Sequence, residues 1–565
     1  MSSRSYQVFR RSAFGRRTAI RGAAAGGAGL TAFLVACGGS KDKEAGTSSG
    51  QQGSPAGTAA AGAATPAPKP GGTLTYRIND NPPSLNLWTE FTYIVAGAIA
   101  PAYNQLLQLD PLDESKIIPD LAKSYEYTNP DKTEIVFKLQ EGKVTFHDGS
   151  EFTAEDVRAT YEWLREPPKG QTSQRTTAAR NIQSIEVVDP KTVKFKLKQP
   201  QASFTSSITN HHYAMGSKAI VTKTNTLLDP DQNPIGTGPF AFKGWKRNSV
   251  IDVEKYKGYW RQGFPYLDAV STFIVPEDTT ALTNFLAGQI QILRPRVADI
   301  PRIEKELGNR GTVQVTPGLS RSALIPNGTK PPFNDPRMRE ALSAAVDRTE
   351  YNSIRSEGKG FIGGYDNPKG QWGLPEAELA KFTGYNGKAD LQKAKQLMTA
   401  AGQGDGYKGR MPARQDFEEN AVALQAMLKK AGFDFTLEIE KSAVLTQRAT
   451  ATDFDVLCHT WSTPADDPDD SFAEMLIHPD RAGRNWAKIV IPEVDRLFDQ
   501  QRAEFDLDKR KKLVYDLDKV ALAQYPNILV QYDPQTNAWY NSVQNFKAHV
   551  SIYTNQRLEI VWLSK

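Results

Sequence analysis

The stretch TFHDGSEFTAEDV, at residues 145–157, marks a change from strand to helix. Just before it, the alternating run IVFKL at residues 135–139 is typical of a half-buried strand. Within the stretch 145–157, Gly149 can adopt the positive φ of a tight turn. Thr153 stands three residues before an acid, as in a capping box. The stretch therefore predicts a strand, a turn and a helix over 154–166, a succession typical of a mixed α/β protein.

Strand and helix patterns alternate on both sides of this stretch, from residue 71 to the C-terminus. Apolar residues that recur with a period of two predict further strands over 72–78 and 192–197. Caps and apolar spacing predict helices over 337–351, 390–401 and 419–431, and through about thirty residues after Pro492. No repeat of fixed period is present. We expect an α/β or α+β fold with more than one core.

The composition and the charge exclude several classes of protein. The 565 residues are 39% hydrophobic and 24% charged, which fits neither a disordered polyelectrolyte nor an integral membrane protein. The net charge of +5 would suit a nucleic acid or an anionic membrane as partner. However, residues 1–36 hold six arginines and no acid, and the rest of the chain has 63 basic and 64 acidic residues. We therefore expect no nucleic-acid partner.

Residues 1–36 have the pattern of a signal peptide, with a basic start followed by a weakly apolar run over 23–36. As a helix this run would cover about 21 Å, which is less than the roughly 30 Å hydrocarbon core of a bilayer. The pair Arg16-Arg17 resembles a twin-arginine export signal. Arg10-Arg11 is a rival pair, so general export remains an alternative.

The sequence LVAC, ending at Cys37, resembles a bacterial lipobox, in which the signal is cleaved before a cysteine that carries a diacylglycerol. Residues 37–70 would then be the lipidated cysteine and a flexible linker rich in Gly, Ser, Ala, Thr and Pro. We expect an extracytoplasmic protein anchored to the cell membrane, on the periplasmic side if an outer membrane exists. The only other cysteine, Cys458, follows an apolar run and is expected to be buried.

The search for catalytic and metal-binding motifs gives negative results. The motifs typical of zinc hydrolases, elbow-type serine hydrolases and P-loop NTPases do not occur in the sequence. Gly236-Thr237-Gly238 is followed by a proline, which predicts a turn and not a dinucleotide loop. The six histidines lack metal-ligand spacing, and the acids of 466–470 lack the pattern of a calcium loop. We expect no catalytic residue, no metal and no cofactor.

Several stretches, taken in order, resemble one family. The opening stretch and residues 121–126 resemble the signature of the peptide/nickel-type solute-binding proteins of ABC importers, which include dipeptide and oligopeptide receptors. The insertion of one residue within 142–146 is a small departure. Further matches follow at 235–240, 256–260, 331–342, 346–348 and 506–510.

The resemblance implies a two-lobed periplasmic-binding-protein type II fold, with an additional α/β domain beside lobe I, that closes on its solute at a hinge. The implied partners are a small-molecule solute and the transmembrane subunits of an ABC permease, and we expect a monomer. An exported enzyme or sensor partner on the same scaffold is the alternative. The implied divisions are 71–95, 230–315 and 535–565 for lobe I, 96–229 for the additional domain, and 316–534 for lobe II.

The loop at 460–468 bears on the choice of solute. It resembles the family segment in which a Trp, here Trp461, is followed three residues later by an Asp that pairs with the α-ammonium group of a peptide. Pro464 stands at that place. We therefore expect free peptides to bind poorly unless Asp466 reaches the same position.

Aromatic side chains give a second indication of the solute. Trp461 is expected to form a wall of the cleft, and other aromatic residues could stack on a flat solute, although each could instead pack in a core. Thr463 and Asn485 would add neutral hydrogen-bonding groups. These features favour a neutral solute such as an oligosaccharide, with an oligopeptide or a metal chelate as alternatives. The other aromatic candidates are Trp88, Tyr93, Tyr365, Trp372 and Trp486.

Overall fold

The computed structural model describes residues 67–90, 93–171, 173, 177–224, 233–463, 465–481, 484–551 and 557–564. The predictions for residues 1–66, which include the signal peptide, Cys37 and most of the linker, lie outside these ranges. Among the described residues, no helix is both long enough and apolar enough to cross a membrane.

A mixed sheet of ten strands runs through the described chain in the order β14-β13-β15-β12-β16-β11-β1-β10-β9-β8. Strand β1 pairs in parallel with β10, whereas β12 pairs antiparallel with both β15 and β16. The strands are β1 Thr73–Ile78, β8 Phe240–Lys246, β9 Val250–Lys255, β10 Ala269–Ile274, β11 Ile292–Leu293, β12 Gly311–Pro326, β13 Tyr407–Arg414, β14 Phe433–Glu440, β15 Val456–Ser462 and β16 Ile528–Tyr540.

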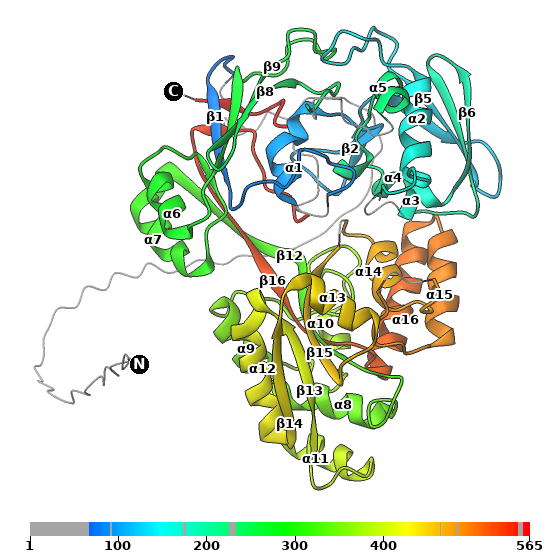
Figure 1. Ribbon diagram of the computed structural model, residues 1–565, viewed down its shortest axis with the longest axis vertical. Coiled ribbons are helices and arrows are strands. Elements are labelled where there is room, and N and C mark those ends of the chain that lie inside the picture. The colour runs from blue at the N-terminus through cyan, green and yellow to red at the C-terminus, as the bar shows by residue number, and fades with distance from the viewer. Residues whose placement is uncertain are drawn as a thin grey trace, which may run out of the picture. The chain divides into compact units, whose positions relative to one another are not determined.

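The two longest strands, β12 and β16, connect the two parts of this sheet. Figure 1 shows them running diagonally from the part that holds β1, β8 and β9 to the part that holds β13, β14 and β15. Their pairing shifts register between Pro317 and Arg321, and Pro317 lies opposite Pro534. A second shift follows between Ser322 and Ala323, so the two parts are joined by a pair of strands with two irregular points.

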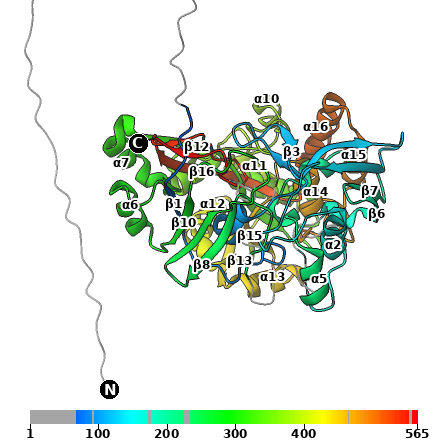
Figure 2. The same ribbon diagram turned by 90° about the horizontal axis from the view of Figure 1, so that it is seen from above.

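A second sheet, in the order β4-β5-β7-β6, lies beside the first part. Figure 2 shows β6 and β7 at the opposite end of the described chain from helices α6 and α7. The shorter strands are β2 Leu107–Leu109, β3 Ile117–Pro119, β4 Ala122–Tyr127, β5 Glu134–Leu139, β6 Ile182–Asp189, β7 Thr192–Leu197, β17 Val543–Gln544 and β18 Trp562–Leu563.

The α-helices cover the faces and ends of these sheets. Helices α14, α15 and α16 stand below α3 and α4 in Figure 1. The helices are α1 Tyr93–Ile99, α2 Ala154–Arg165, α3 Thr177–Arg180, α4 Phe204–Ser207, α5 Lys218–Thr224, α6 Asp278–Leu286, α7 Ile300–Leu307, α8 Pro336–Ala345, α9 Arg348–Ser356, α10 Glu376–Leu379, α11 Leu391–Ala400, α12 Glu418–Ala431, α13 Ser442–Thr450, α14 Pro468–Met475, α15 Pro492–Ala503 and α16 Leu507–Gln524.

The opening stretch folds as predicted. Strand β5 precedes it, Gly149 has a φ of 86°, and α2 begins with a full capping box between Thr153 and Asp156. The turn also packs against the predicted turn at 236–239, because His147 donates its backbone N–H to the carbonyl of Gly236 at 2.9 Å. The two turns are therefore packed together as scaffold.

One predicted helix is wrong as a single element. Residues 337–351 are divided between α8 and α9, because Val346 is extended and the Asp347 side chain caps a new helix by accepting from the backbone N–H of Glu350. The helices predicted over 390–401 and 419–431 are confirmed as α11 and α12.

The buried apolar side chains form several clusters, as expected for more than one core. The largest cluster is built from buried side chains that lie between Ala323 and Val530 in the sequence. A second cluster lies around the four-stranded sheet β4-β5-β7-β6 and α2. Cys458 is fully buried in the largest cluster, which confirms its predicted structural position. The predicted bounds of the two lobes and the additional domain remain predictions.

Candidate binding site

A cavity of about 380 Å³, here called the main cavity, opens where six separate segments meet. One wall comes from the β2–β3 region and the end of α4, and the opposite wall comes from the loops before α10 and α14. Strand β12 and the C-terminal segment close it from the side. The lining residues are Leu109, Glu114, Ser115, Ile117, Ser206, Thr209, Asn210, Thr316, Pro317, Asn367, Lys369, Gly370, Gln371, Ala465, Asp466, Asp467, Val550 and Ser551.

The main cavity is acidic. Glu114, Asp466 and Asp467 line it, and Lys369 is the lysine among its lining residues. Two of the three carboxylates already have partners: Glu114 accepts from the backbone N–H of Val550 at 2.8 Å, and Asp467 is held by Arg510. A cationic solute group would therefore find complementary charge here.

Asp466 differs from the other two acids, because no hydrogen bond to its carboxylate is found among the described residues. Burial raises its pKa to about 7, with further increases from Asp467 and Glu114, while Arg321 acts in the opposite direction. The residue is half-buried, so the carboxylate is surrounded by protein yet still borders the cavity. The site thus holds a carboxylate whose ionised form would be stabilised by a nearby cation.

Trp372 and Gly370 help to set the position of Asp466. Trp372 donates its indole N–H to the Asp466 carbonyl at 3.1 Å, and the Arg510 guanidinium lies 4.6 Å from the centre of the Trp372 ring. Gly370 allows the carboxylate to approach, because a Cβ at that position would lie 2.3 Å from Asp466 Oδ2. Of the predicted site residues, the structure therefore brings Asp466 and Trp372 together.

A buried polar group lies below this loop. Arg321 is 1% exposed, and its guanidinium lies 5.7 Å from the ring centre of Trp461 and 5.6 Å from that of Tyr532. Asp366 and Asp518 are buried nearby, and burial raises the pKa of Asp518 to about 7. Arg321 therefore supplies positive charge beneath the acidic cavity.

Two predicted residues lie at the end of β15, beside the cavity loop. Trp461 is 7% exposed, and its indole N–H is buried with no hydrogen-bond partner among the described residues. Thr463 is also buried, and its backbone N–H donates to the carbonyl of Leu319 at 3.3 Å. Pro464 lies outside the described residues.

Four other predicted residues are packed inside the protein. Trp88 donates to the carbonyl of Ala214 at 2.9 Å, and Asn485 donates to the carbonyls of residues 476, 477 and 489. Tyr365 is fully buried, and Trp486 packs edge-on against His459. The Tyr93 side chain lies outside what the structure describes. A binding role for these residues remains a prediction.

Sequence reasoning missed most of the cavity wall. Glu114, Thr316, Lys369 and Ser551 come from four segments that are far apart in the chain, and only the fold brings them together. No local motif surrounds any of them. The loop at 460–468, which contains Asp466, was the part of the sequence that pointed to this site.

The cavity between separate segments of the chain agrees with the class of protein that comparisons with known sequences indicate. The family described as bacterial extracellular solute-binding proteins, family 5 Middle, matches residues 116–483. The chain belongs to this family. It is an extracytoplasmic solute-binding receptor for import by an ABC transporter, and not an enzyme.

Individual relatives cover most of the chain. The dipeptide-binding protein of Escherichia coli K12 is 26% identical over 489 residues, which are 81% of this chain and 89% of the relative. The oligopeptide-binding protein AppA of Bacillus subtilis is 28% identical over 460 residues, with 76% and 80% covered.

A solved structure confirms the fold class. The binding protein AgaA of A. tumefaciens R10, in complex with agropinic acid, superimposes with a TM-score of 0.74 at 26% identity, and the match covers 87% of this chain and 99% of AgaA. The fold is the two-lobed, mixed α/β fold of type II periplasmic binding proteins.

Proposed function

We propose that this receptor captures a peptide-like solute and that the Asp466 carboxylate binds the cationic amino group of that solute. The observation that carries the proposal is a carboxylate on the wall of the main cavity with no hydrogen-bond partner among the described residues. An ammonium group would supply the missing partner and favour the ionised carboxylate. Trp372 acts as a positioning residue through its hydrogen bond to the Asp466 carbonyl.

This proposal replaces the oligosaccharide favoured by the sequence. The relatives that cover most of the chain are named for dipeptides and oligopeptides, which do not support a sugar ligand. The expectation of poor peptide binding depended on Pro464, and it allowed for Asp466 to take over the role. The position of Asp466 on the main cavity favours that alternative.

The test is calorimetric titration of the full-length chain with alanine di- and tripeptides and with their N-acetylated forms. Free peptides should bind, N-acetylation should weaken binding, and Asp466→Asn should lower the affinity for free peptides by about 30-fold or more, since a buried charge pair is lost. Asp508→Asn, on the exposed first turn of α16, is the matched control and should bind as the parent does. Equal affinity for free and acetylated peptides would contradict the proposal.

We also propose that the mature protein begins at a lipidated Cys37 and delivers its solute as a membrane-anchored monomer. The supporting observation is the order of an arginine pair, a weakly apolar run and LVAC in the sequence. In membrane fractionation, the parent should sediment with membranes, and Cys37→Ser should release the protein from them. A Cys37→Ser protein that still sediments with membranes would overturn this part.

A further inference from the structure

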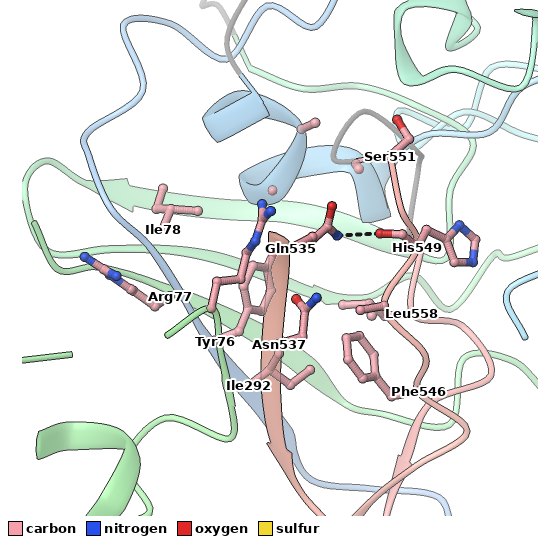
Figure 3. A pocket seen from close by; sticks show the side chains of 15 residues that line it. Tyr76, Arg77, Ile78, Ile292, Gln535, Asn537, Phe546, His549, Ser551 and Leu558 are labelled. Atoms are coloured by element: carbon pink, nitrogen blue, oxygen red, sulfur yellow. Dashed lines mark hydrogen bonds between the residues drawn. The ribbon is translucent and has the colours of Figure 1, made fainter. Parts of the chain in front are cut away.

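A second cavity, of about 120 Å³ and here called the small cavity, lies between α1, β1, β11, β16 and the C-terminal segment (Figure 3). Ile78, Ile292, Phe546 and Leu558 provide apolar walls. The polar side chains of Gln535 and Asn537 come from alternate positions on β16, and both are labelled in Figure 3. The cavity thus has apolar walls together with two amides from one strand.

The small cavity adjoins the main cavity. Ser551 lines both of them. In addition, Gln535 of the small cavity is the register partner of Thr316, which lines the main cavity. Since paired strands lie about 4.8 Å apart, one solute can contact both cavities.

The charge of the small cavity is opposite to that of the main cavity. Its lining residues include Arg77 and Arg294 and, among the described residues, no acid. Arg77 is engaged elsewhere, because it donates to the carbonyls of residues 275 and 276 and pairs with Asp278. Arg294 directly follows the β11 residue Leu293, which lies opposite Ala538 on β16, and both Arg294 and Asn537 line the small cavity. A guanidinium and an amide therefore come from neighbouring backbone positions.

Asn537 has an unused hydrogen-bond donor. The residue is 4% exposed, and its Nδ2 is buried with no partner among the described residues. By contrast, the Gln535 amide donates to the backbone carbonyl of His549, the contact dashed in Figure 3. A buried N–H group without an acceptor costs free energy, and a ligand oxygen would remove this cost.

We propose that the small cavity binds a carboxylate of the same solute, with Asn537 Nδ2 and Arg294 as donors. This inference rests on the proposed function, since it takes the solute to be held by its amino group at Asp466. The solute would then be a zwitterion that spans an acidic and a basic cavity. The carboxylate can be the α-carboxylate of a short peptide or the side chain of an acidic residue.

The test compares free-acid alanine peptides, their C-terminal amides, and amidated peptides that contain Glu or Gln, by calorimetry on the full-length chain. The variants are Asn537→Asp, which places a negative charge where the carboxylate would lie, and Arg294→Gln. Both should weaken binding of carboxylate-bearing peptides about 10-fold or more and leave ligands without a carboxylate unchanged. Asn309→Asp, at an exposed position, is the control.

The outcomes separate the two proposals and the two sources of carboxylate. If C-terminal amidation of alanine peptides reproduces the effect of Asn537→Asp, the α-carboxylate is the bound group. If the two variants weaken binding of the amidated Glu peptides alone, the bound group is a side-chain carboxylate. If peptides bind and depend on Asp466 while neither variant discriminates between acids and amides, the inference is overturned and the proposed function stands. If no peptide binds the parent, both fail.

Discussion

Asp466 combines two properties that a receptor for a cationic group requires. Its carboxylate borders the main cavity, and its pKa is raised to about 7 by burial and by the neighbouring Asp467 and Glu114. A group with this pKa is partly protonated near neutral pH, whereas a cation binds its ionised form. Binding of solute should therefore be linked to release of a proton from this residue.

The affinity for a free peptide should consequently depend on pH. Below about pH 7 the affinity should fall by up to about tenfold per pH unit as Asp466 becomes protonated, and it should fall again above about pH 8 as the α-ammonium group loses its proton. Calorimetry between pH 5 and 9 would measure both limbs. Asp466→Asn should abolish the acidic limb, and an affinity that is constant from pH 5 to 7 in the parent would contradict this assignment.

The loop at 460–468 allowed Asp466 to be singled out from the sequence, but not the environment that this residue has in the fold. Asp467 lies next to Asp466 in the chain, yet Arg510 neutralises it from α16. The aromatic candidates show the same limit, because Trp88 and Tyr365 satisfy their polar atoms within the protein. A pattern of residue types does not reveal which polar groups tertiary packing will leave without partners.

At the scale of elements, helices α14, α15 and α16 meet around one buried arginine. Arg510 contacts Asp467 through two hydrogen bonds of 2.7 and 3.1 Å and also donates to Gln501 at 3.0 Å. Gln501 in turn donates to Asp469 at 2.7 Å. This network sets the start of α14, and therefore the position of the preceding cavity loop.

Replacement of Arg510 should destabilise the protein strongly. Arg510→Met would leave the buried Asp467 carboxylate without its partner, which is expected to cost about 3–5 kcal/mol of the free energy of unfolding. Urea denaturation would measure the loss. Lys512→Met, on an exposed face of the same helix, should change stability by no more than about 0.5 kcal/mol, and an Arg510 variant of equal stability to it would refute the prediction.

The elements that could be predicted were those with a strong local signal. The capping box of α2 and the C-terminal glycine of α12 are both local to the end of the helix that they delimit. The break between α8 and α9 escaped prediction because the apolar spacing continues through Val346, whose side chain is fully buried. Burial of that side chain is compatible with an extended backbone, which spacing alone does not reveal.

At the scale of the whole molecule, the segment that leads into α4 contacts helices α14 and α15 next to the main cavity. Gln201 and Ser203 donate to the Asp469 carboxylate, and the backbone N–H of Ala202 donates to the carbonyl of Arg502 at 2.8 Å. Tyr127 packs edge-on against Phe505 with ring centres 5.1 Å apart. These contacts would be lost if the two segments moved apart.

Loss of the side-chain contacts should therefore favour an open form. Gln201→Ala combined with Ser203→Ala should weaken solute binding severalfold by reducing the closed population, while the additional domain itself stays folded. Calorimetry would measure the affinity, and small-angle X-ray scattering without solute would show a larger radius of gyration. Ser184→Ala, on the exposed side of β6, is the control, and unchanged affinity in the double variant would exclude this role.

The pairing of Pro317 with Pro534 has a mechanical consequence for the strands that join the lobes. Neither residue has a backbone N–H, so this rung of the β12–β16 ladder carries no hydrogen bond from either side. Bending is resisted least where the ladder has fewest bonds to distort. We therefore expect β12 and β16 to bend most easily at this pair, and because Pro317 also lines the main cavity, a solute bound there would lie directly beside the bend.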